Sequence, residues 1–513
     1  MAKETNTIVI IGGGPAGLTA AYQLQKEHYN GRIIILEASD HLGGIAATIE
    51  HNGNYMDLGG HRFFTKSEEV LNIWFDLFQK QTQPAKDELE HGENFGDYST
   101  LLEDDSGSPE KRDDVMLTRR RVSRIYYKGK FFDYPIKLSA KLFINMGFVD
   151  TMRAGFGYMK TWFKKLPEDS LENFYINRFG KPLYQMFFES YTEKLWGIHP
   201  SKLDASWGAQ RVKGLSVGAV LKNALFKPKN KETSLIERFY YPKFGPGQMW
   251  TLMAERLLTN GAEICYNAEV RSITKAGDTW RVMTKDGDEY TADKVISSMP
   301  IRDLIGAFGD AVPADVKAAA DLHYRDFQTV GILAKKLNLA NKTKMKTVNG
   351  IIPDCWIYIQ DAGVTVGRVQ VFNNWSPYLV KDEDTCWIGM EFFCNEGDEL
   401  WNMTDDEFIA LAVQDIEKLG IVSKENILDT HRIRVKKAYP VYDDAYQTFD
   451  KVKGWLNDCD GIYCVGRNGQ HRYNNLDHSM LTGYYAARCI TRGEDKTQLW
   501  AVNTEKEYHE SKS

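Results

Sequence analysis

The sequence lacks three features that would each point to one class of protein: paired cysteines, a long apolar run and a large excess of charge of one sign. Its seven cysteines include no C-x-x-C pair, so neither a disulfide framework nor a metal site is indicated, and a reducing, cytoplasmic setting is expected. The first apolar run, Ile8 to Ile11, is short. Nowhere do about 18 uninterrupted apolar residues occur, so no signal peptide or membrane span is predicted.

The charge balance is nearly even. Lys and Arg number 64 and Asp and Glu 70, which gives a formal net charge of -6. Such a chain has no broad cationic field for nucleic acid or acidic membranes, although a few local arginines would still hold a small anionic ligand. What the chain does have is size, at 513 residues, and many aromatic side chains: 12 Trp, 26 Tyr and 25 Phe. These values predict a packed enzyme with one large domain or two to three interleaved domains.

The first strong motif is a glycine turn between a short strand and a helix, followed by a second strand that ends in an acid. Gly12 permits a tight turn, Gly14 lets the backbone approach a pyrophosphate, and Gly17 allows close packing of the helix. Glu37, twenty residues after Gly17, is placed to accept hydrogen bonds from ribose hydroxyls. The motif predicts a dinucleotide site that contains Gly12, Gly14, Pro15, Ala16, Gly17 and Glu37.

NAD enzymes share that motif, and other segments favour FAD. Residues 37–48, with Ala38, Gly43 and Gly44, resemble the second glycine motif of FAD enzymes related to amine oxidases and protoporphyrinogen oxidase. The segment from Gly466 to Ser479 resembles their closing motif, in which a helix N-terminus would point at the flavin ring. The resemblance implies further FAD contacts at Gly60, His61, Val270, Gly466, Arg467, Asn475, Asp477, His478 and Ser479.

From the Gly59-Gly60-His61 segment onward the resemblance narrows to the longer UDP-galactopyranose mutases. Short landmarks in the same order support it: 121–123, 195–196, 207–212, 373–378 and 438–440. In that family N5 of reduced FAD attacks the anomeric carbon of a nucleotide-bound pyranose and expels the diphosphate. The sugar ring opens, recloses as a furanose and recaptures the diphosphate, so there is no net oxidation. The resemblance thus implies an isomerase of cell-surface polysaccharide biosynthesis, with a nucleotide sugar as substrate.

The family's substrate residues carry over position by position. Arg211 and Arg368 match two arginines that clamp the diphosphate, a task that suits the planar, permanently charged guanidinium group. Tyr358, Tyr439 and Tyr473 match tyrosines that hydrogen-bond the diphosphate. The residues of the uridine and sugar pockets find no clear match, which leaves the nucleotide and the sugar open.

His61 matches a histidine in a loop against the flavin, where it would position the ring and respond to its reduction. Together with Arg211 and Arg368 it forms the predicted catalytic set. Because a mutase works only when its flavin is reduced, NADH or NADPH is expected as a transient reductant. Assembly into a homo-oligomer stays open.

Two other functions compete with the mutase hypothesis. A true oxidase or desaturase of the amine oxidase and protoporphyrinogen oxidase type would use the same flavin fold with a more apolar pocket and no need for paired arginines. A flavin-holding scaffold without turnover would need neither arginines nor pocket tyrosines. The cationic clamp therefore separates the mutase hypothesis from the other two.

The motifs predict an α/β fold in which a Rossmann-type FAD-binding domain is interleaved with a mixed-sheet substrate domain and a helical domain. Residues 86–114 hold 11 acidic against 3 basic residues, typical of a solvated insertion. The expected division is 1–82, 242–305 and 455–495 for FAD, 83–115 for the acidic insertion, 116–241 for the mainly helical substrate or cap domain, 306–454 for the mixed-sheet substrate domain and 496–513 for the tail.

Overall fold

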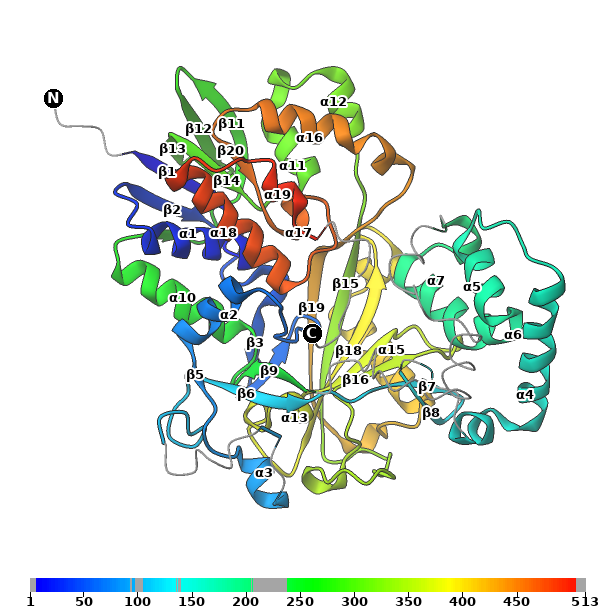
Figure 1. The fold of residues 1–513 in the computed structure, drawn as a ribbon. Coiled ribbons are helices and arrows are strands. Elements are labelled where there is room, and N and C mark those ends of the chain that lie inside the picture. Colours follow the sequence, from blue (N-terminus) through cyan, green and yellow to red (C-terminus); the bar gives the residue numbers. More distant parts are fainter. Residues whose placement is uncertain are drawn as a thin grey trace.

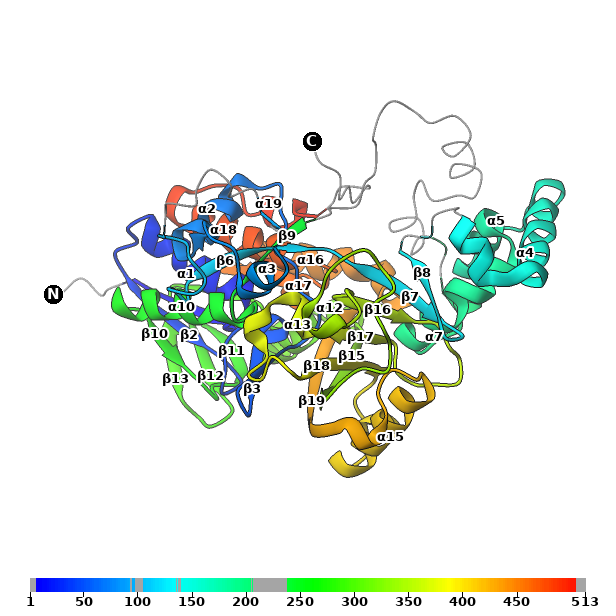
Figure 2. The same ribbon diagram turned by 90° about the horizontal axis from the view of Figure 1, so that it is seen from below.

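The computed structural model describes residues 6–92, 95–96, 105–134, 136, 140–203, 205 and 238–503. A parallel sheet with its helices lies at one end of the molecule, a long mixed sheet lies in the middle, and a cluster of helices stands at the other end (Figures 1 and 2). No helix within the described ranges combines the length and apolarity needed to cross a bilayer.

The nucleotide-binding region is built on a five-stranded sheet in which all pairings are parallel. Its strands come from distant parts of the chain, in the order β10 (Glu263–Cys265), β2 (Arg32–Leu36), β1 (Thr7–Ile11), β14 (Lys294–Ser297) and β20 (Ile462–Cys464). The chain therefore leaves this sheet and returns to it more than once, as the scattered motifs predicted.

Both faces of this sheet are covered, which explains why its strands are almost wholly apolar. Ile8 and Ile10 face a core shared with α1 (Pro15–Lys26), α2 (Glu68–Leu77), α10 (Gly247–Thr259) and α18 (Leu476–Arg492). Val9 and Ile11 point the other way, as the two-residue period of a strand requires. Their core is shared with β11 (Val270–Ala276), β12 (Thr279–Thr284), β13 (Glu289–Ala292), α11 (Ile301–Ala307), α12 (Ala314–Ala319) and α16 (Phe449–Asp458).

The central sheet has seven strands and mixes parallel and antiparallel pairings. Its order is β19 (Ile427–Pro440), β15 (Tyr324–Ala334), β18 (Cys386–Cys394), β17 (Arg368–Val371), β16 (Trp356–Ile359), β7 (Ser123–Tyr127) and β8 (Lys130–Asp133). Every residue of β18 is buried, because α15 (Asp405–Lys418) packs on one face and the aromatic interior of the molecule on the other.

The helical cluster contains α4 (Ala140–Phe163), α5 (Leu171–Phe179), α6 (Lys181–Tyr184) and α7 (Ser190–Trp196). Gly147, with φ of +79° and ψ of 167°, breaks α4 into two helical pieces. One π-helical turn, Gln185–Glu189, joins α6 to α7. The other α-helices in the part of the chain that the structure describes are α3 (Lys86–His91), α13 (Phe372–Trp375), α14 (Glu399–Asn402), α17 (Gly466–Gly469) and α19 (Gln498–Ala501).

Two small sheets connect these regions. One pairs β3 (Thr48–His51) with β4 (Asn54–Asp57), and the other orders β5 (Gln79–Lys80), β6 (Val115–Arg120) and β9 (Arg238–Pro242). The expectation of a fully solvated acidic insertion is wrong for Asp87 and Glu88, which are buried. Asp87 pairs with the buried Arg119, and Glu88 accepts from Gln81 and from the backbone of Ala85.

The predicted fold class is confirmed: a Rossmann-type parallel sheet is interleaved with a mixed sheet and a helical region. The exact domain boundaries stay a prediction. β7 and β8 lie in the range 116–241, which was expected to be mainly helical, and they join the central sheet.

Candidate active site

The glycine turn after β1 is packed as a dinucleotide fingerprint requires. Gly12 has φ of +100°, and a Cβ there would lie 2.1 Å from Oγ of Ser298. A Cβ on Gly17 would lie 2.0 Å from the carbonyl oxygen of Gly12, so only glycine lets α1 approach the strand this closely.

Gly14 is different, because its surroundings are open. A Cβ on Gly14 would meet nothing nearer than the carbonyl oxygen of Gly43 at 4.0 Å, and Gly44 faces it from the second glycine segment. Gly14 is also the N-cap of α1, where no side chain caps the helix, and Pro15 and Ala16 open the first turn. Open space beside uncapped N–H groups fits a pyrophosphate. The residues present therefore fit the cofactor predicted from the sequence.

Glu37 is buried at the end of β2. Its carboxylate accepts from the backbone N–H of Gly13 at 2.7 Å and from the N–H and hydroxyl of Ser39 at 2.9 and 2.8 Å. A carboxylate offers about four acceptor positions, so room remains for the predicted ribose hydroxyl. Ala38 is exposed beside it. Val270 is buried at the start of β11, and Ala268, two residues earlier, donates to the carbonyl of Glu37.

The closing motif forms the N-terminus of α18. Asn475 is the N-cap, and Nδ1 of His478 accepts from its backbone N–H at 3.3 Å, which makes His478 a capping residue. Asp477 lies in the first turn and Ser479 is buried. Gly466, with φ of +79°, begins α17 after β20, and its N–H donates to Thr482 of α18. The start of this helix thus reaches the cavity described next.

A cavity lies where the central sheet meets the start of α18. It encloses about 650 Å³ of empty volume, part of it open to solvent. Three arginines line it, Arg62 after β4, Arg121 before β7 and Arg368 on β17. The other lining residues are Gly60, Ser123, Phe239, Cys355, Trp356, Tyr358, Trp375, Tyr473 and Asn475. Three guanidinium groups and aromatic walls suit a phosphorylated ligand that also carries a ring.

Arg368 is held by several close contacts. Its Nη2 lies 2.5 Å from Oε2 of Glu391 and 2.5 Å from the hydroxyl of Tyr439. The guanidinium carbon lies 4.7 Å from the ring centroid of Trp356. Burial alone would lower the pKa of Arg368, but Glu391 and the surrounding tyrosines raise it well above its ordinary value. The group is a fixed cation at every physiological pH.

The three predicted tyrosines lie around Arg368. Tyr439 and Tyr473 stack with ring centroids 5.8 Å apart. Tyr358 packs between Tyr134 and Trp356. Burial raises the pKa of both Tyr358 and Tyr439, so both hydroxyls stay protonated and are available as hydrogen-bond donors.

Arg467 stands beside this group. Its guanidinium lies 4.6 Å from the centroid of Tyr473 and donates to the carbonyl oxygens of Asn474 and Ala438. It therefore holds the loop before α18 against the end of β19, and the predicted contact with the cofactor stays a prediction.

His61 follows Gly60, where a Cβ would lie 1.7 Å from the Trp356 ring. Burial and the nearby Arg467 guanidinium lower the pKa of His61 to about 4. The ring is therefore neutral near pH 7. Its Nδ1 donates to the carbonyl of Gly59 at 3.0 Å, which leaves Nε2 as the acceptor.

The structure brings together most of the predicted substrate residues, but not all. Arg211 lies outside the described residues, so its role stays a prediction. Sequence reasoning missed Arg62 as a site residue although it directly follows His61, and it treated Arg121 only as a family landmark. Their position is the signal that could have found them. Arg62 follows β4 and Arg121 precedes β7, both at the edge of the cavity.

A family model described as flavin containing amine oxidoreductase matches residues 15–490. The fold and the site define a flavin enzyme. The chain belongs to the flavin-containing amine oxidoreductase family, as the FAD motifs predicted.

Among curated relatives, coproporphyrinogen III oxidase of Staphylococcus aureus (strain NCTC 8325 / PS 47) is 21% identical over 327 residues, 60% of this chain and 63% of that protein. Chloroplastic protoporphyrinogen oxidase 1 of Spinacia oleracea is 26% identical over 247 residues, 46% of this chain and 38% of that protein. The chain thus spans less than two thirds of the length of the curated relatives it matches first.

Among solved structures, reduced UDP-galactopyranose mutase superposes with a TM-score of 0.76 and 21% identity, covering 98% of this chain and 99% of that one. A triple mutant of putrescine oxidase gives a TM-score of 0.59 at 14% identity, with 95% and 99% covered. At these identities the likeness shows the fold and leaves the reaction to be argued from the site.

Proposed function

We propose that the protein is a flavin-dependent nucleotide-sugar mutase that interconverts pyranose and furanose forms without net oxidation. One observation carries the proposal: Arg62, Arg121 and Arg368 line a single cavity next to the start of α18. A departing diphosphate needs several fixed cations, whereas an oxidase of an uncharged substrate gains nothing from three guanidinium groups in its pocket. An oxidase of a carboxylated substrate would use them only to bind it.

The side chains around Arg368 suit the holding of a diphosphate through bond cleavage. Arg368 stays charged, and the hydroxyls of Tyr358 and Tyr439 stay protonated. Fixed donors stabilise the growing charge on a leaving diphosphate without having to reorganise first. Arg211 would complete the clamp from the segment outside the described residues.

Reduced flavin supplies the nucleophile of this chemistry when it is bound. Neutral His61 would hold the loop after β4 and present Nε2 as an acceptor near the ring. NADH or NADPH would deliver the electrons before the first turnover. The same site leaves the identity of the nucleotide and of the sugar to experiment.

A flavin oxidase or desaturase is the second candidate, and it has an observation in its favour. The curated relatives reported above are oxidases of coproporphyrinogen III and protoporphyrinogen.

Cys355, in the cavity wall, is not expected to act as a nucleophile in either reaction, because burial raises the pKa of its thiol to about 11.

One experiment separates the two. Purified protein is reduced with dithionite without oxygen and incubated with a panel of nucleotide pyranoses, starting with UDP-galactopyranose; the products are resolved by chromatography. A mutase gives an isomer of unchanged mass only when the flavin is reduced. No isomer from any member of the panel, together with steady O₂ consumption on an apolar ring substrate, would make the protein an oxidase.

A further inference from the structure

The outer side of α4 exposes an unusual number of large apolar side chains. Both ribbon views place this helix at the outer edge of the helical cluster, at the far end from the nucleotide-binding sheet (Figures 1 and 2). Phe148, Trp162 and Phe163 are 81%, 67% and 86% exposed. The full exposed set on α4 is Phe143, Ile144, Phe148, Val149, Met152, Phe156, Met159, Trp162 and Phe163. Soluble surfaces rarely gather so many in one place.

These side chains form one stripe. At about 100° per residue, the exposed apolar residues between Phe148 and Phe163 fall within an arc of about 140°. The arc is on the side of α4 away from its neighbours, because Ala154 and Thr161 are buried on the opposite side. A Cβ on Gly157 would lie 2.3 Å from Pro182, which shows how closely that opposite side meets α6.

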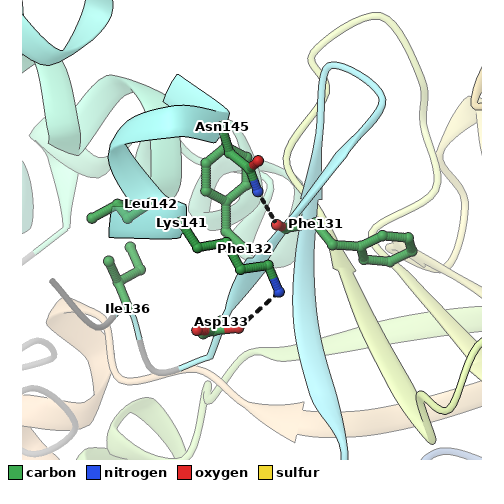
Figure 3. A pocket seen from close by; sticks show the side chains of 7 residues that line it. All are labelled: Phe131, Phe132, Asp133, Ile136, Lys141, Leu142 and Asn145. Atoms are coloured by element: carbon green, nitrogen blue, oxygen red, sulfur yellow. Dashed lines mark hydrogen bonds and ion pairs between the residues drawn. The ribbon is translucent and has the colours of Figure 1, made fainter. Parts of the chain in front are cut away.

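The first piece of α4, before the break at Gly147, is held against β8. Figure 3 shows a small pocket, about 200 Å³, between β8 and the first turns of α4. There Nδ2 of Asn145 donates to the carbonyl oxygen of Phe131 at 2.8 Å, and Lys141 lies 3.8 Å from Asp133. This pocket is lined mainly by apolar groups and serves the packing of α4 on the central sheet.

Basic residues border the stripe. Residues 140–165 contain five Lys or Arg and one Asp, in a chain whose net charge is -6. Arg153, Lys160 and Lys164 are exposed. On α4, Arg153 and Lys160 fall within about 40° of one edge of the arc, and Lys164 directly follows the helix. Long basic side chains at the edge of an apolar face reach up to headgroups while their stems stay against the apolar layer.

We propose that α4 rests on the surface of an anionic phospholipid bilayer, with its apolar stripe in the acyl boundary and its basic edge among the headgroups. Trp and Phe on one face and Lys and Arg beside it are the composition of interfacial helices. A two-fold contact between antiparallel α4 helices of two copies would instead bring the same cations together. The even overall charge, which argues against a broad cationic field, is compatible with this local one.

The apolar half of the proposal is tested by flotation of the holoprotein with vesicles of equal parts phosphatidylcholine and phosphatidylglycerol. The variant F148S/F163S is expected to lower the bound fraction about tenfold or more. The matched control L89S/L428S removes two other exposed apolar side chains, 59% and 46% exposed, and is expected to float like the wild type. Because all four positions are exposed, flavin content and unfolding temperature should stay unchanged in both variants.

The role of the basic edge is tested with the variant K160E/K164E in the same flotation assay. The control K342E/K344E has the same net charge and also replaces two exposed lysines. Only the first pair should weaken binding to the anionic vesicles. High salt should weaken binding of the wild type, and vesicles of phosphatidylcholine alone should bind less.

Three results would overturn the proposal. The wild type would stay with the soluble fraction in the presence of anionic vesicles, or F148S/F163S would float as well as the wild type. The third is that light scattering shows a dimer which F148S/F163S converts to monomer while vesicles bind neither form; the stripe would then be a contact between two copies.

Discussion

Arg368 and Glu391 face each other across two neighbouring strands, β17 and β18, and form an ion pair of 2.5 Å in the wall of the cavity. Glu391 is completely buried, and its other oxygen accepts from Nε2 of Gln370 at 2.8 Å. The pair fixes the direction of the guanidinium group without using a flexible loop. The predicted clamp residue is thus part of the rigid sheet, and the carboxylate behind it was not visible from any motif.

Removing Arg368 alone would leave Glu391 as an uncompensated buried charge, at a cost of about 3–5 kcal/mol. The double variant R368A/E391Q avoids this cost. We expect it to fold and to keep its flavin absorbance, while turnover falls about 100-fold or more because a fixed cation at the leaving group is lost. Flavin content, urea unfolding and the rate of isomerisation measure the three effects separately.

The exposed ion pair between Arg281 on β12 and Glu289 on β13 supplies the control. R281A/E289Q removes an ion pair between neighbouring strands outside the cavity and should keep full turnover. Wild-type rates in R368A/E391Q would show that Arg368 does not act on the substrate.

Two glycines of the first turn should respond to alanine in opposite ways. A Cβ added at Gly14 meets open space, so G14A should fold, lose flavin and unfold at the temperature of the flavin-free wild type. At Gly17 the added Cβ would lie 2.0 Å from a backbone oxygen, so G17A should destabilise the fold. Flavin retention on gel filtration and thermal unfolding distinguish the two. Tight flavin binding by G14A would place the pyrophosphate elsewhere.

The stability of the protein should depend on the protonation of His61. Its pKa is about 4 in the folded state, against an ordinary value of 6.5. As pH falls, the unfolded chain therefore binds a proton at His61 before the folded chain does. The contribution of neutral His61 to the free energy of unfolding is fully present above about pH 6.5 and is lost between there and pH 4. H61N should reduce this decline by about 3 kcal/mol, measured by urea unfolding across pH.

His471 is the matched control, since burial lowers its pKa to about 4 as well, and it lies outside the cavity lining. H471N should flatten the same pH dependence without changing turnover at neutral pH. Each variant is compared with itself at different pH values, so a loss of stability that is the same at every pH does not affect the comparison. An unchanged decline in H61N would mean that His61 already binds its proton near its ordinary pKa.

The sequence predicted the parts of the site that depend on local geometry. Gly12, Gly17 and Glu37 stand at spacings that one strand, one turn and one helix impose, and the structure places them accordingly. Arg368 and Tyr358 came from a resemblance, and they face one another across β16 and β17.

Contacts between segments that are distant in the chain could not be predicted from local spacing in the sequence. Arg62, Arg121 and Glu391 reach the cavity wall or its backing only because β4, β7 and β18 come together in space, and no local period records that pairing. His478 accepts from the backbone N–H of Asn475 and so caps α18, a role that its place at the helix start already allowed, and its predicted contact with the cofactor stays a prediction.

The proposed reaction breaks and remakes the bond between the anomeric carbon and the diphosphate. A nucleotide pyranose with ¹⁸O in that bridging position tests this step directly by positional isotope exchange. With reduced protein, the label should move into the non-bridging positions of the same phosphate, and with oxidised protein it should stay in place. A label that stays in the bridge for every nucleotide sugar that binds the reduced protein would contradict the mutase account.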